Sequence, residues 1–147
     1  MLRTIFSFQG RVARLPYLGY SLLVGLLACL IIVIVSIIAA ITSSHDPLGP
    51  LVMLIVVGLM VGVMTIWAGF ALIIKRLHDL GLSGLHLIVI VLMGLSATAL
   101  QDVAPTISIL LSVVTLGVHL FLIFAPGQPG QNRFGPAPTG VRTAFPA

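Results

Sequence analysis

Three long apolar runs dominate the chain. They are the residues Leu18–Thr42, Leu51–Ile74 and Val103–Ala125. Each run exceeds the roughly 20 apolar residues that a transmembrane helix needs, and none contains Asp, Glu, Lys or Arg. Pro50 precedes the second run and Pro126 follows the last one, as is typical of helix boundaries. The pattern therefore predicts three membrane-spanning helices.

A fourth apolar run, Leu85–Leu100, is shorter. Its 16 residues would form a helix of about 24 Å, whereas the hydrocarbon core of a bilayer is about 30 Å thick. We expect this helix to gain length from Leu80 onward or from Gln101. With that extension it becomes a fourth membrane span.

The pattern inside the runs distinguishes helices from strands. Backbone polar groups in a bilayer are satisfied only within helices or closed barrels. Barrel strands are about 10 residues long and alternate in polarity, and no segment of this chain alternates in that way. The sequence therefore predicts an all-α polytopic membrane protein with four transmembrane helices.

The composition supports the membrane class. Of the 147 residues, 59% are hydrophobic and 7% are charged, against about 25% charged residues in a typical soluble domain. Such a chain has too few polar groups to cover its surface in water. The single cysteine, Cys29, excludes an internal disulfide.

The basic residues give the topology an orientation. All seven lie before Leu18, between Ile74 and Leu85, or after Ala125. They are Arg3, Arg11, Arg14, Lys75, Arg76, Arg133 and Arg142. The positive-inside rule then places both termini and the second connection in the cytoplasm. Asp46 and Asp102 fall on the outer side, and Asp79 is the single acidic residue on the cytoplasmic side.

The chain divides into three parts. Residues 1–17 form a cytoplasmic or interfacial N-terminal segment, and residues 18–125 form the four-helix transmembrane domain. Residues 126–147 form a cytoplasmic tail with 5 Pro and 4 Gly among 22 residues. This composition cannot continue the last helix and predicts irregular structure.

Two features inside the spans allow more than one interpretation. Gly58 and Gly62 form a GxxxG motif, which lets helices approach closely, either within the bundle or between copies in a homo-oligomer. His119 is an ionisable residue within the last run, Val103–Ala125. A neutral, hydrogen-bonded histidine inside the bundle is the favoured interpretation, and a functional intramembrane group is the alternative.

Three polar motifs flank the spans: FQGRVARLPY (Phe8–Tyr17), RLHDLGLSG (Arg76–Gly84) and GQPGQNRFG (Gly127–Gly135). In order and spacing they resemble the bacterial membrane family catalogued as domain of unknown function 805 (DUF805), the YhaH-like proteins, over roughly residues 5–138. The resemblance implies a small integral inner-membrane protein and implies no particular activity. Leu18, Leu85 and His86 stand where family members carry Trp, so any role of those tryptophans does not carry over.

The orientation places all three motifs on the cytoplasmic side. We therefore expect one cluster there, composed of Arg11, Arg14, Arg76, His78, Asp79, Asn132 and Arg133. On a helix continuing from the second span, Asp79 shares a face with Lys75 and Arg76. Arginines from the other motifs could also reach it, because arginine forms bidentate bonds with carboxylates. An Asp–Arg clamp would tie the N-terminal segment, the loop and the tail together.

A binding function is compatible with this clamp. A strongly basic surface at the membrane suits anionic lipid headgroups or another partner. Membrane lipids are therefore the partners that we expect, with a possible homo-oligomer through the Gly58–Gly62 face and no nucleic acid.

The alternative is an oligomeric transporter or channel component, or a membrane enzyme that uses the His-Asp loop. Adjacent helical residues point about 100° apart, so His78 and Asp79 do not readily share one metal ion. No set of nucleophile, base and orienting group is visible either. The residues thus favour a protein that is not an enzyme, and we predict no catalytic residue, metal or cofactor.

Overall fold

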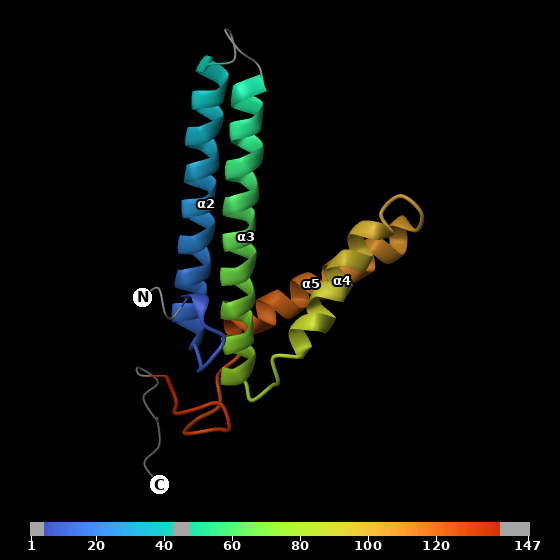
Figure 1. The fold of residues 1–147 in the computed structure, drawn as a ribbon. Helices are drawn as coiled ribbons and strands as arrows, with labels where there is room; N and C mark the ends of the chain where they lie inside the picture. Colours follow the sequence, from blue (N-terminus) through green and yellow to red (C-terminus); the bar gives the residue numbers. More distant parts are fainter. Residues whose placement is uncertain (1–4, 43–47, 139–147) are drawn as a thin grey trace.

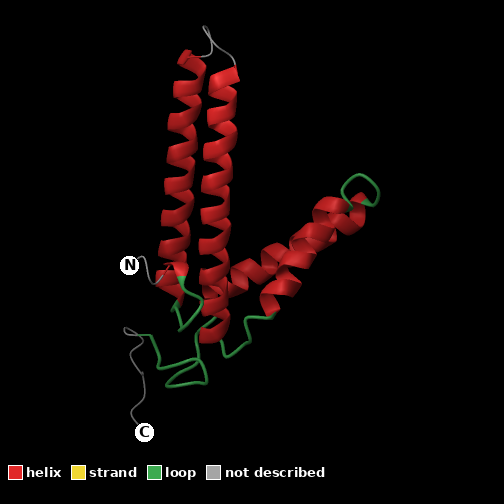
Figure 2. Cartoon of the chain, in the orientation of Figure 1, coloured by secondary structure: helices red, strands yellow, loops and turns green. Residues whose placement is uncertain are grey.

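The computed structural model describes residues 5–42 and 48–138 (Figure 1). Its helices are α2 (Arg14–Thr42), α3 (Leu48–Asp79), α4 (His86–Ala99) and α5 (Pro105–Phe124). The described residues contain no strand, only an isolated bridge between Asn132 and Gly135 (Figure 2). The predicted all-helical fold is confirmed for this part of the chain.

Three of the helices are long and apolar enough to cross a membrane. The helices α2, α3 and α5 have 29, 32 and 20 residues, and their most apolar windows have mean hydropathies of 3.3, 2.6 and 2.5. At about 1.5 Å per residue, α2 and α3 are roughly 44 and 48 Å long, well beyond a hydrocarbon core of about 30 Å.

The short helix α4 corrects the prediction for the fourth span. It has only 14 residues, or about 21 Å, because residues 80–85 and 100–103 form turns and do not extend it. Gly81 has φ +77°, a left-handed conformation that ends helices. The amide of Leu82 donates to the carbonyl of Leu77 at 2.8 Å and closes the end of α3. The expected extension from Leu80 or Gln101 is thus wrong.

The helices form two hairpins that meet at one end (Figure 1). The helices α2 and α3 run side by side, and α4 and α5 form a second hairpin that leans away from the first. The last turn of α3 and the last turn of α5 lie close together at the shared end. The segment before α2 and residues 126–138 gather at the same end.

The buried core lies at this meeting point. Its members come from all four helices and from the segment before α2: Val12, Tyr17, Leu72, Leu77, Leu87, Ile90 and Leu122. In contrast, only 6–11% of the apolar windows of α2, α3 and α5 is buried. Long apolar faces of this kind suit contact with lipid, while the core fixes the geometry of the shared end.

The GxxxG residues leave open space where a side chain would lie. Nothing among the described residues lies within 4 Å of a Cβ built at Gly58 or Gly62. The interpretation that they allow close packing within the bundle therefore finds no support. A homo-oligomer through this face stays a prediction.

Candidate functional site

The carboxylate of Asp79 lies at the C-terminal end of α3, between two arginines. Its Oδ1 accepts from Arg11 Nη2 at 3.0 Å and from Arg11 Nε at 3.2 Å. Its Oδ2 accepts from Nη1 of Arg76, which lies one helical turn earlier. The three side chains are at most 2% exposed, so these are buried ion pairs. We call the region around them the junction site: residues 8–12, the last turn of α3 with residues 80–84, and residues 125–135.

Arg76 also connects α3 to the end of α5. Its Nε donates to the carbonyl of Leu122 at 2.7 Å, and its Nη2 donates to the carbonyl of Ala125. The last carbonyls of a helix lack partners within the helix and favour a cation nearby. The guanidinium thus satisfies two backbone acceptors and one carboxylate oxygen, which offsets much of the cost of burying its charge.

Arg11 makes the corresponding connection to the segment after α5. Its Nη1 donates to the carbonyl of Gly130 at 2.7 Å and, at 3.4 Å, to that of Gly135. Its Nη2 donates to the carbonyl of Gln128. The amide of Gln128 in turn donates to the backbone carbonyl of Asp79 at 2.8 Å. One arginine thereby contacts both the end of α3 and the C-terminal segment.

A backbone contact holds the N-terminal segment against α3. The amide of Val12 donates to the carbonyl of Lys75 at 3.3 Å. Val12 is itself part of the buried core. Lys75, the neighbour of Arg76 in sequence, is also buried. Arg11 is therefore positioned by the residue that follows it as well as by its own ion pair.

His78 forms a second set of contacts on another side of α3. Its Nδ1 lies 3.2 Å from the carbonyl of Gly10, and its ring stacks on that of Phe134 with centroids 3.9 Å apart. The amide nitrogen of the Asn132 side chain donates to the carbonyl of His78 at 2.9 Å. The Arg133 guanidinium lies 4.6 Å from the centroid of the Phe134 ring. His78 and Asp79 thus contact the C-terminal segment through different groups.

The loop that carries these residues is shaped by its own hydrogen bonds. The backbones of Asn132 and Gly135 pair through bonds of 3.1 and 3.0 Å. The side-chain oxygen of Asn132 accepts from the amide of Phe134 at 2.9 Å. This tight turn presents the Phe134 ring to His78.

The structure brings together six of the seven residues predicted for the cytoplasmic cluster. Arg11, Arg76, His78, Asp79, Asn132 and Arg133 all make contacts within the junction site. Arg14 begins α2 and is exposed at the same end of the molecule. Whether the ion pairs act as a clamp, and whether the cluster binds lipid, stay predictions.

His119 is not part of the junction site. Its Nδ1 lies 2.8 Å from the carbonyl of Thr115, one turn earlier in α5, and its side chain is half-buried. His86, beside the Asp79 loop in sequence, is exposed, with Nδ1 2.8 Å from the carbonyl of Ser83. In the described ranges, no three His, Cys, Asp or Glu side chains cluster closely enough to hold a metal ion.

Several partners in the junction site were not singled out in the sequence. They are Gly10, Leu122, Ala125, Gln128 and Phe134. Four of them contribute a backbone carbonyl, which every residue type has, so no side-chain pattern identifies them. The sequence signal for three of the five was their place inside a quoted motif, FQGRVARLPY for Gly10 and GQPGQNRFG for Gln128 and Phe134.

The chain was compared with known proteins and protein families. No curated protein and no solved structure matches it. One family model matches, described as "Protein of unknown function (DUF805)", and it covers residues 5–136. The match includes all three polar motifs and every helix described above. The chain therefore belongs to the DUF805 family.

Proposed function

We propose that this protein is an integral protein of the bacterial inner membrane whose cytoplasmic end forms a fixed basic surface for anionic lipid headgroups. The proposal rests on a difference in burial among the arginines. Arg11 and Arg76 are buried in ion pairs with Asp79, while Arg14 and Arg133 remain exposed at the same end of the molecule. The first pair holds the surface together, and the second pair faces the surroundings.

The orientation follows from the distribution of charge. The described lysines and arginines belong to the segment before α2, the first residue of α2, the C-terminal end of α3 and the segment after α5. These parts of the chain gather at the end where the hairpins meet (Figure 1). Basic residues mark the cytoplasmic side of membrane proteins. The anionic leaflet on that side attracts each exposed Lys or Arg by about 1 kcal/mol. The same charges therefore support both the topology and the choice of ligand.

The buried ion pairs explain why the surface would keep its shape. Removing one partner of a buried pair typically costs about 3–5 kcal/mol, since the other charge is left without compensation. Here Asp79 compensates two arginines, and these reach α5 and the C-terminal segment. We therefore assign Asp79 the role of a clamp that joins residues 8–12, α3, α5 and residues 126–135.

Arg133 illustrates how an exposed arginine is positioned on this surface. Its guanidinium packs over Phe134 and donates to the carbonyl of Gly81 at 3.3 Å. That bond uses Nη2, and a guanidinium carries five N–H donors, so the same fork can also donate to a phosphate. The stacked arrangement limits the entropy lost on binding.

Native mass spectrometry of the full-length protein with phosphatidylglycerol and phosphatidylcholine tests the proposal. Replacing Arg14 and Arg133 together by Gln should lower the preference for phosphatidylglycerol by roughly tenfold or more, given about 1 kcal/mol per arginine. The matched control replaces Gln9 and Gln131, exposed residues of the same motifs, by Ala and should keep the preference. An equal preference in both double variants would overturn lipid binding by this surface.

The alternatives predicted from the sequence were an oligomeric transporter or channel component and a membrane enzyme. No contact among the described residues favours either one. Both stay predictions.

A further inference from the structure

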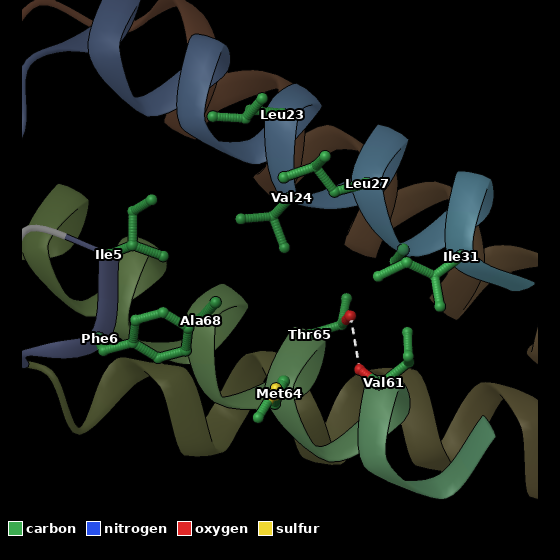
Figure 3. Close-up of a pocket in the computed structure, with 11 residues that line it drawn as sticks. Ile5, Phe6, Leu23, Val24, Leu27, Ile31, Val61, Met64, Thr65 and Ala68 are labelled. Atoms are coloured by element: carbon green, nitrogen blue, oxygen red, sulfur yellow. Dashed lines mark hydrogen bonds between the residues drawn. The ribbon is translucent and has the colours of Figure 1, made fainter. Parts of the chain in front are cut away.

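An apolar groove lies between α2 and α3 (Figure 3). Its volume is about 240 Å³. One wall comes from α2, the other from α3, and Ile5 and Phe6 lie across one end. The lining residues are Ile5, Phe6, Leu23, Val24, Leu27, Ala28, Ile31, Val61, Met64, Thr65 and Ala68.

The lining offers no free polar group to a ligand. Thr65 is its single polar side chain, and its hydroxyl donates to the carbonyl of Val61 at 2.7 Å within α3. Apolar protein cavities of about 150 Å³ stay dry and take up apolar molecules. This groove is larger, so an apolar ligand is the occupant that its chemistry selects.

The position of the groove points to the membrane as the source of that ligand. The lining residues of α2, from Leu23 to Ile31, lie inside a helix that is long and apolar enough to cross a bilayer. They extend over about 12 Å, within the roughly 15 Å depth of one leaflet. Leu27, Ile31 and Met64 are 51%, 42% and 59% exposed, so the groove opens to the outer surface of the helices.

The closed end of the groove is fixed by aromatic contacts. Trp67 Nε1 donates to the carbonyl of Phe6 at 3.1 Å, and the ring of Phe8 meets that of Trp67 edge-on at 4.9 Å. This end lies toward the start of α2 (Figure 1). There the exposed Arg14 precedes Leu23 by about 2.5 helical turns. A charge that suits a phosphate thus stands on the side of the groove where headgroups would lie.

We infer that this groove binds one acyl chain of a membrane phospholipid. The chain lies between α2 and α3 with its carbonyl end toward Phe6, and the headgroup remains at the basic end of the helices. Only the preference for an anionic headgroup rests on the proposed function. Insertion of the acyl chain rests on the groove itself.

Photo-crosslinking can test this inference on the full-length protein in liposomes. The probe is phosphatidylglycerol with a diazirine in its acyl chain, and peptide mapping locates the adducts. In the wild type, adducts should concentrate on Leu27, Ile31 and Met64. Even labelling of all exposed faces of α2, α3 and α5 would overturn the inference.

Two variants that fill the groove sharpen the test. Ala28→Phe changes the α2 wall and Val61→Phe changes the α3 wall, and each should lose most of the labelling inside the groove. The matched control is Ala40→Phe on the exposed surface of α2, which should keep the wild-type map. Labelling that persists inside the groove in a filled variant with an unchanged melting temperature would contradict acyl-chain binding.

A second probe separates the groove from the headgroup preference. Phosphatidylethanolamine with the same diazirine-bearing chain replaces phosphatidylglycerol. Weaker groove labelling by this lipid supports both proposals. Equal labelling by the two lipids, abolished in Ala28→Phe, supports the acyl-chain site and counts against the anionic headgroup preference.

Discussion

Gly127 passes so close to Asp79 that no side chain fits between them. A Cβ built at Gly127 would lie 2.1 Å from Asp79 Oδ2, the oxygen that also accepts from Arg76. The glycine in the C-terminal motif is therefore a packing requirement of the carboxylate at the end of α3. This relationship links two motifs that lie almost 50 residues apart in the sequence.

Replacing Gly127 by Ala should therefore destabilise the protein. The new methyl group would displace the Asp79 carboxylate and break its buried ion pairs, at a cost of up to about 3–5 kcal/mol. Thermal unfolding in detergent measures the loss. Gly117→Ala is the control, because nothing among the described residues lies within 4 Å of a Cβ at that helical position. Equal melting temperatures for the two variants would count against the close packing of Gly127 on Asp79.

Asp79→Asn should destabilise the protein as strongly as Gly127→Ala. The amide removes the negative charge but keeps the size of the side chain, so Arg11 and Arg76 are left buried without a counter-ion. We expect a loss of about 3–5 kcal/mol in the free energy of unfolding. Asp102→Asn, at an exposed position of the turn after α4, should melt like the wild type. If Asp79→Asn melts at the same temperature as this control, the ion pairs contribute nothing to the stability of the fold.

Arg76→Lys should fail to replace arginine although it keeps the charge. Nε, Nη1 and Nη2 of Arg76 each donate to a different acceptor, on Leu122, Asp79 and Ala125. A lysine ammonium is a point charge without this planar fork. The melting temperature should fall clearly, whereas Arg14→Lys at an exposed position should leave it unchanged. Full stability of Arg76→Lys would mean that charge alone suffices at this position.

Phe134→Ala should loosen the C-terminal segment from α3. The substitution removes the stacked contact with His78, and aromatic pairs of this kind contribute about 0.5–1.5 kcal/mol. Hydrogen exchange should then become faster at the amide of Gln128, which donates to the carbonyl of Asp79. Phe124→Ala is the control, because that ring is 70% exposed on α5. Unchanged exchange at Gln128 would contradict a role for the stack in holding this segment.

The sequence predicts the helices well because their signal is local. Unbroken apolar runs dictate helical spans in lipid, and α2, α3 and α5 lie where these runs lie. The run Leu85–Leu100 predicts a longer helix than α4, which has 14 residues. A run of apolar residues does not reveal where a turn such as that at Gly81 interrupts it.

The junction site was only partly predictable. Asp79 stood out as the single acidic residue among many bases, which drew attention to Arg11 and Arg76. The contacts of these arginines with backbone carbonyls of α5 and the C-terminal segment depend on how the hairpins meet. The groove between α2 and α3 depends likewise on which faces pair, and a helix that is apolar all round does not specify its facing side.

A double-mutant cycle between Arg11 and Asp79 gives the sharpest test of the clamp. It compares unfolding of the wild type, Arg11→Gln, Asp79→Asn and the double variant in the same detergent. Because the two side chains are paired and buried, the cycle should give a coupling energy within about 0.5–3 kcal/mol, toward its upper end. Effects that add to within about 0.3–0.5 kcal/mol would contradict a clamp centred on Asp79.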